Sequence, residues 1–242
     1  MKKFLKITGI SLLVILVLLI TAPFLFKGKI VALIKEEANK NLNATLNFDD
    51  DISISLIRSF PKLSVGIEKL SIIGKDSFNG DTLVYLPSFK ATLNLMSVIK
   101  GEKIEINSIG LEQPMINLIV LESGKANWDI AKADSTAKDE DTSASKFKMA
   151  LDKLDIKDGY LSYNDKSLTF NTVLKHFNHG LSGDFTADNF LLKTFTTAEE
   201  FTLGYGGVNY LYKVAANIKA NLDMDMKNMK FTFSEFVSES RK

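Results

Sequence analysis

The chain has 242 residues, of which 45% are hydrophobic and 24% are charged, and it contains no cysteine. This composition suits one membrane anchor and about two hundred residues of folded domain, and it excludes disulfides, zinc thiolate sites and a lipid-modified N-terminal cysteine. The formal net charge is +1, from 30 basic and 29 acidic residues, so no global field recruits nucleic acid. We therefore expect no nucleic-acid partner.

Residues 7–26 form an uncharged run in which fourteen of the side chains are Leu, Ile, Val or Phe. At 1.5 Å per residue, a helix of this length spans a bilayer core. Lysines at positions 2, 3 and 6 precede the run, so the positive-inside rule places residues 1–6 in the cytoplasm and the rest of the chain outside. The alternative is a cleaved signal peptide, but its apolar region is normally shorter, and no small-x-small cleavage site follows Ile20. We predict an uncleaved single-pass anchor.

Residues 29–42 place apolar side chains at spacings of three and four, which predicts a short amphipathic helix. Such a helix can lie on the bilayer surface or cover one end of a following sheet. Both interpretations remain open from the sequence.

From residue 43 the apolar period changes to two, which predicts a hairpin over residues 43–56 and then further strands. Leu63 and Leu70 belong to opposite phases of one strand, so a bulge is needed near Glu68 and Lys69 if one face is to stay apolar. A short helical turn is expected over residues 96–99. The first β region then occupies residues 43–130.

Residues 131–146 contain no large apolar side chain and predict a flexible linker loop. A second β region, residues 147–242, continues with the same alternation of strand and turn. The expected fold is mainly β, with a transmembrane helix and an amphipathic helix followed by a long antiparallel, curved, groove-like sheet.

Few residues suggest reactive chemistry. His176 and His179 are three residues apart and could bind a metal, but they lie at a predicted strand end with no third ligand at motif spacing. The acidic run at residues 49–51 lacks the alternating ligands of a calcium loop and is expected to be a solvated turn. Trp128 could contact lipid headgroups or pack into the core. We predict no catalytic residue, metal or cofactor, and no enzyme activity.

The apolar face of the sheet must be buried by a second sheet, by a closing helix or by acyl chains. A protein-filled core and a lipid-binding groove are both compatible with the alternation. The candidate groove positions are Leu63, Val65, Ile67, Phe89, Ala91, Leu93, Leu95, Ile104, Ile106, Ile116, Leu118 and Val120.

Several short motifs between residues 60 and 130 occur in a characteristic order, and the most specific is Gly-Lys-Ala-Asn-Trp-Asp at residues 124–129. Others are Phe-Pro-Lys-Leu at residues 60–63, Phe-Asn-Gly-Asp-Thr-Leu at 78–83, Leu-Asn-Leu at 93–95 and Pro-Met-Ile at 114–116. This pattern resembles the N-terminal region of the AsmA family. The later stretches at residues 156–163 and 181–185 are similar to the family's next segment, so the resemblance covers nearly the whole chain.

The resemblance implies a Gram-negative inner-membrane protein with its bulk in the periplasm and a role in outer-membrane biogenesis. Relatives are similar to chorein-like bridge proteins, whose β groove carries lipids. Family members are usually longer, so we expect this chain to be truncated or to be a module that needs a partner, and about a dozen strands at 4.8 Å each would span little more than one bilayer. The expected function is binding or conducting membrane phospholipid. The alternatives are an anchored scaffold for envelope-assembly proteins and an anchored hydrolase, which would need a polar pocket that the sequence does not show.

Overall fold

A computed structural model describes residues 27–28, 31–36, 38, 40–56, 62–100, 104–132, 147–185 and 187–241. The predicted anchor at residues 7–26 and most of the predicted linker lie outside these residues. Within the described parts of the chain, no helix has the length and apolarity needed to cross a bilayer.

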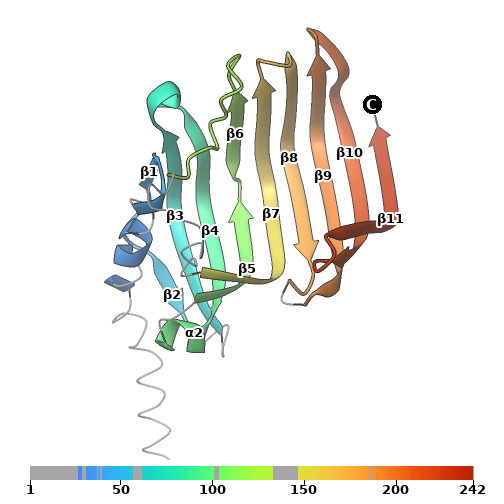
Figure 1. The fold of residues 1–242 in the computed structure, drawn as a ribbon. Coiled ribbons are helices and arrows are strands. Elements are labelled where there is room, and N and C mark those ends of the chain that lie inside the picture. Colours follow the sequence, from blue (N-terminus) through green and yellow to red (C-terminus); the bar gives the residue numbers. More distant parts are fainter. Residues whose placement is uncertain are drawn as a thin grey trace, which may run out of the picture.

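The fold is one curved sheet of eleven strands with short helical segments at its N-terminal side (Figure 1). The strands are β1 (Ala44–Asn47), β2 (Ser53–Ser55), β3 (Lys62–Gly74), β4 (Thr82–Asn94), β5 (Ile104–Glu112), β6 (Met115–Val120), β7 (Phe147–Asp165), β8 (Phe170–Ser182), β9 (Asn189–Tyr205), β10 (Val208–Asp225) and β11 (Lys230–Arg241). The 3-10 turn η1 (Asp76–Phe78) and the helix α2 (Leu95–Lys100) join neighbouring strands. The helical turn predicted over residues 96–99 is therefore confirmed.

Two predictions of strand pairing are wrong. β1 and β2 do not form a hairpin, because each pairs antiparallel with a different part of β3. The sheet is not antiparallel throughout either, since β7 runs parallel to both β5 and β6. Parallel neighbours need a long crossover connection, and residues 121–146 supply it. The predicted linker belongs to this crossover, and its first residue, Ala131, forms a β-bridge with Leu42.

The long strands change phase along one line that crosses the sheet, here called the crease. On each strand two consecutive residues face outward there, so the inward-facing residues are three apart instead of two. The inward-facing neighbours across the crease are Ile67 and Leu70, Leu86 and Phe89, Leu111 and Pro114, Ile156 and Gly159, Leu174 and Phe177, Ala198 and Phe201, and Leu211 and Val214.

Left-handed backbone conformations produce much of the crease. Lys69, Gln113, Asp158, His176 and Lys213 have φ between 49° and 53° at this level of the sheet. The bulge predicted near Glu68 and Lys69 is thus a left-handed residue, and the register between β3 and β4 continues unchanged past it. The crease separates a lower half of the sheet, which holds β5, from an upper half, which holds β6 (Figure 1).

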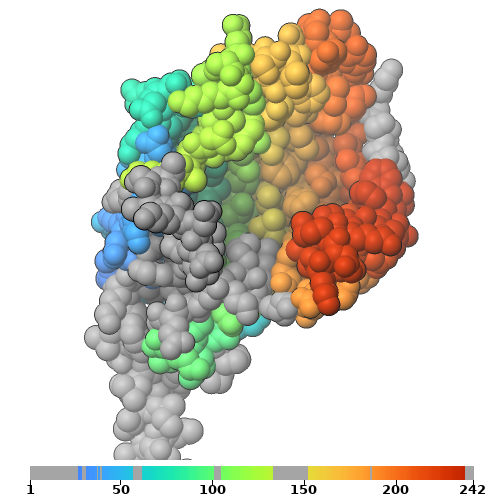
Figure 2. Space-filling view, in the orientation of Figure 1, coloured from blue at the N-terminus to red at the C-terminus, as the bar shows by residue number. Residues whose placement is uncertain are grey.

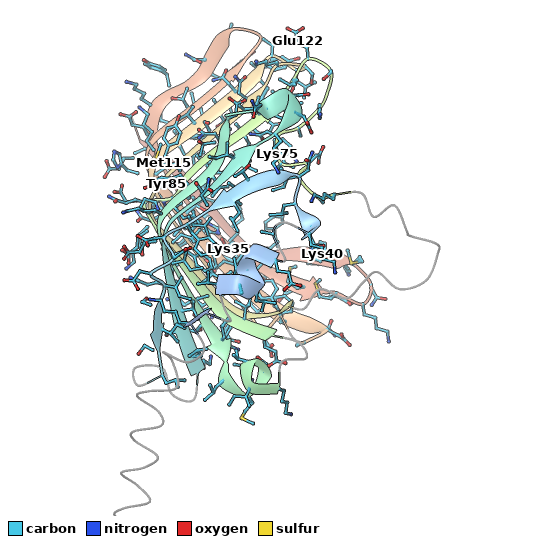
Figure 3. The ribbon with its side chains drawn as sticks, turned by 90° about the vertical axis from the view of Figure 1, so that its left-hand side faces the viewer. Lys35, Lys40, Lys75, Tyr85, Met115 and Glu122 are labelled. Atoms are coloured by element: carbon cyan, nitrogen blue, oxygen red, sulfur yellow. The ribbon has the colours of Figure 1, made fainter. Side chains whose placement is uncertain are left out.

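The sheet is bent so that its two halves enclose the N-terminal helical segment, which carries Lys35 and Lys40 (Figure 3). We call the face toward this segment the inner face; Tyr85 and Met115 lie on the opposite, outer side (Figure 3). Val31 and Ile34 of the helical segment pack on the main core cluster. The predicted amphipathic helix therefore covers one end of the sheet, and each side chain it helps to bury fully contributes about 1.5–3 kcal/mol.

Candidate functional site

Registered rows of mainly apolar side chains cross the inner face of the lower half. Residues opposite each other in neighbouring strands share a face, so the strand pairing defines each row. One row is Ile67, Phe89, Leu111, Ile156, His179, Thr196 and Ile218. The next is Val65, Ala91, Ile109, Leu154, Leu181, Thr194, Ala220 and Phe236. We call this surface the trough.

The two ends of the trough differ in cover. At the covered end, on β3 and β4, Val65 is 4% exposed and Leu93 is 9% exposed. At the open end, on β10 and β11, the exposed fraction is 37% for Ile218, 60% for Phe236 and 64% for Phe233. The front of the molecule is hollowed between the N-terminal segments and the C-terminal strands (Figure 2). The apolar side chains of the trough therefore extend past its covered end, as far as β10 and β11.

The candidate groove residues divide between these environments. Five of them, on β3 and β4, are buried in the core cluster: Leu63, Val65, Ile67, Ala91 and Leu93. Phe89, Leu95 and Ile106 pack against that cluster, although Leu95 begins α2 and is not in a strand. Ile104 begins β5. Ile116, Leu118 and Val120 lie on β6 in the upper half and continue the inner face there.

The open end was missed among the candidates. Phe231, Phe233 and Phe236 belong to a predicted strand, and Phe231 and Phe233 alternate with polar residues in the usual way. They are exposed because no described segment folds over them, and a local sequence pattern does not report such cover. The sequence does contain one indication of this apolar surface, which is the high density of phenylalanine in the last predicted strand.

The acidic run at residues 49–51 helps to hold the cover in place. Asp50 accepts a hydrogen bond from Lys35 Nζ at 2.7 Å, and Asp51 is paired with Lys27. All three carboxylates stay exposed, so the acidic run is a solvated turn as predicted, and two of its carboxylates also pair with lysines that precede β1.

Asn127, in the Gly-Lys-Ala-Asn-Trp-Asp motif, closes an unpaired edge of β6. Its side-chain oxygen accepts from the Ile119 N–H at 2.9 Å, and its side-chain nitrogen donates to the Asn117 carbonyl at 2.8 Å. The Asn127 N–H also donates to the Ile119 carbonyl at 2.9 Å. Asn127 is 2% exposed, so these bonds satisfy backbone groups that are shielded from water. The motif therefore fixes the start of the crossover against the sheet.

Trp128 follows this clamp and lies at the upper half of the inner face. Its ring centroid is 5.9 Å from that of Tyr163, which in turn is 5.8 Å from that of Phe170. Trp128 is 39% exposed, so it is neither packed into the core nor free of protein contacts. The aromatic row extends the apolar inner face above the crease.

His176 and His179 lie on opposite faces and do not form a joint metal site. His176 is on the outer face, where its Nδ1 is 2.6 Å from Asp158 Oδ1; this contact raises the pKa of His176. His179 lies within the trough, and burial lowers its pKa. No cluster of three potential metal-ligating side chains occurs among the residues that the structure describes.

From β2 to β8 the outer face carries a polar row beside the apolar rows of the inner face. One outer row is Ser55, Ser64, Thr92, Ser108, Lys153 and Ser182. A shallow hollow of 540 Å³ lies over these strands, and Lys90, Lys153 and Asp155 contribute to its walls. Side chains of opposite character on the two faces give this part of the sheet an apolar side and a water-facing side.

A sequence model of the AsmA family matches residues 1–239 of the chain. Comparison with curated proteins and with solved structures finds no match.

Proposed function

Because the chain belongs to the AsmA family and has an apolar trough that its own cover leaves open at one end, we propose that it binds phospholipid acyl chains. In this proposal the chain is a single-pass inner-membrane protein of the Gram-negative envelope. Its sheet lies in the periplasm and serves outer-membrane biogenesis without an enzymatic step.

The exposure of the open end is the observation that carries this proposal. Phe231, Phe233 and Phe236 are between 47% and 64% exposed on one strand. Exposed apolar side chains in a contiguous patch mark a surface that meets a partner or a lipid. Each methylene of an acyl chain buried there contributes about 0.8 kcal/mol, so affinity would come from contact area.

The position of α2 supports an orientation with the lower half toward the membrane. α2 lies at the lower edge of the sheet (Figure 1), and Met96 and Ile99 on it are 56% and 58% exposed. Lys100 follows in the last turn. Apolar residues beside a basic side chain suit the interface of an anionic bilayer. In this orientation the trough opens close to the source of lipid.

Photo-crosslinking in cells tests the proposal on the full chain. Benzoylphenylalanine replaces Phe233, which faces the trough, or Thr232, which is its neighbour on the outer face. After irradiation, the purified chain is analysed by mass spectrometry for phospholipid adducts. We expect adducts from position 233 at least about tenfold above those from position 232.

Two results would overturn the proposal. Equal phospholipid adducts at both positions would show only general contact with lipid. Protein adducts at position 233 without lipid would instead support the alternative, an anchored scaffold for envelope-assembly proteins.

A further inference from the structure

The trough is interrupted midway by three polar side chains, His179, Thr194 and Thr196, here called the polar notch. His179 stands opposite Ile156 on one side and Thr196 on the other, so the register places it on the inner face. Thr194 stands opposite Leu181 and Ala220 in the adjacent row. The notch is therefore built from two neighbouring strands, β8 and β9, with apolar positions on both sides.

The notch is organised for hydrogen bonding. His179 Nδ1 is 2.8 Å from Thr196 Oγ1. The Thr194 hydroxyl forms no hydrogen bond with any residue that the structure describes. All three residues are half-buried, so their polar groups are partly withdrawn from water but still reachable from the trough. A polar group in such a place is stabilised by a ligand that supplies a hydrogen-bond partner.

The chemistry of the notch favours an anionic oxygen ligand. Threonine hydroxyls and an imidazole N–H donate hydrogen bonds, and donors bind ionised acceptors about twice as strongly as neutral ones. No carboxylate occupies the two inner rows that contain the notch. An anion placed there meets no repulsion from its immediate neighbours on the inner face.

We propose that the polar notch binds the phosphodiester of a phospholipid whose acyl chains lie on the apolar parts of the trough. This inference rests on the proposed function and adds to it the place of the headgroup. It assigns His179, Thr194 and Thr196 a role in selecting phospholipids over lipids without phosphate.

Two fluorescent probes with identical acyl chains separate this role from binding as such. One is NBD-labelled phosphatidylglycerol and the other is NBD-labelled diacylglycerol, which lacks the phosphate. Binding of each probe to the full chain in amphipol is measured by fluorescence. We expect the wild-type chain to bind phosphatidylglycerol at least about tenfold more tightly, as the loss of one charge-assisted hydrogen bond implies.

The triple variant His179→Leu, Thr194→Val and Thr196→Val keeps the size of the side chains and removes the donors. We expect it to bind both probes with similar affinity. The matched control, Asn178→Leu with Thr197→Val, changes the adjacent cross-strand pair on the outer face and should keep the tenfold preference. Circular dichroism and the fluorescence of Trp128 check that both variants are folded.

Each outcome has a distinct meaning. If neither probe binds the wild-type chain, the proposed function itself fails. If both probes bind equally to the wild-type chain, or if the triple variant is folded and keeps the preference, the trough binds lipid but the notch does not hold the phosphate. The single variant Thr194→Val provides a second test if the triple variant does not fold, because a preference left intact by it would also argue against the notch.

Discussion

Leu93 and Phe233 lie on the same face of one sheet, yet one is 9% exposed and the other 64%. Leu93 is covered because the chain before β3 folds back over β3 and β4 and adds Val31 and Ile34 to the core. Nothing in the described chain folds over β11 in the same way. The difference shows that alternation defines an apolar face, whereas the segments outside the strand decide whether that face becomes buried core or stays exposed.

The largest expected effect is a contrast in stability between the two ends. Leu93→Ala should lower the free energy of unfolding by about 2–5 kcal/mol, because it leaves a cavity among buried neighbours. Phe233→Ala should change it by less than about 0.5 kcal/mol, because the ring contributes little to the core. Urea unfolding of the full chain, followed by the fluorescence of Trp128, measures both. Equal losses would show that the open end is part of the core.

The attachment of the crossover to β6 can be loosened at Asn127. Asn127→Ala leaves the Ile119 N–H and the Asn117 carbonyl without their partner, which should cost about 1–3 kcal/mol for each group that stays dry. Lys125→Ala, in the same turn, removes only an exposed contact with Ser77 and serves as the control. Urea unfolding compares the two. A loss no greater than that of the control would mean that water replaces the clamp.

Two glycines on the outer face provide a smaller contrast along the same sheet. A Cβ at Gly180 would clash with the Phe195 ring, whereas a Cβ at Gly110 would meet nothing within 4 Å. Gly180→Ala should therefore lower the free energy of unfolding by about 1–3 kcal/mol. Gly110→Ala should stabilise by about 0.4–1 kcal/mol, because alanine restricts the unfolded chain. Thermal unfolding of both variants checks the signs.

The smallest expected effect on stability comes from the ion pair between His176 and Asp158. This pair lies at the crease, which both the covered end and the open end of the trough share. Asp158 raises the pKa of His176. The stabilisation that protonated His176 gives the folded state is therefore complete below about pH 6.5, and it is lost as pH rises through the pKa of the folded protein. Gln113 and His176 lower the pKa of Asp158, so its contribution is present above about pH 3.9 and is lost as pH falls.

The variant His176→Gln should accordingly lose stability relative to the wild type near pH 5.5 and regain parity near pH 8. The difference should shrink in 1 M salt, because both groups are exposed. Urea midpoints between pH 5 and 8 measure it. A difference independent of pH would mean that the ion pair does not form in solution.

The strands, the helical turn at α2 and the break at Lys69 could be predicted because each depends on local periodicity. The same signal, two consecutive outward-facing residues between two inward-facing ones, also occurs at Asp158 and at His176. We predict a bulge from it only on β3. The parallel pairing of β7 could not be predicted, since it depends on the edge and the direction in which the chain rejoins the sheet after the crossover. The exposure of Phe233 is likewise a property of distant segments.

The notch shows the same limit at the candidate site. The sequence indicates His179 as an unusual residue, but its spacing of three residues from His176 suggests that both histidines bind one metal ion. The predicted strand end is wrong, because β8 continues through both histidines and alternates regularly from His176 to His179. Side chains three residues apart on a regular strand point to opposite faces, so the odd spacing itself separates the two imidazoles.

The crease also has a mechanical consequence. A flat sheet curls easily about an axis parallel to its strands, whereas a sheet folded along a line across them resists that curling, as a corrugation stiffens a thin plate. The kinks of the strands from β3 to β10 lie at the same or neighbouring levels, and left-handed residues fix several of them. If the chain binds acyl chains as proposed, this bend would keep the walls of the trough at a fixed separation while those chains enter or leave.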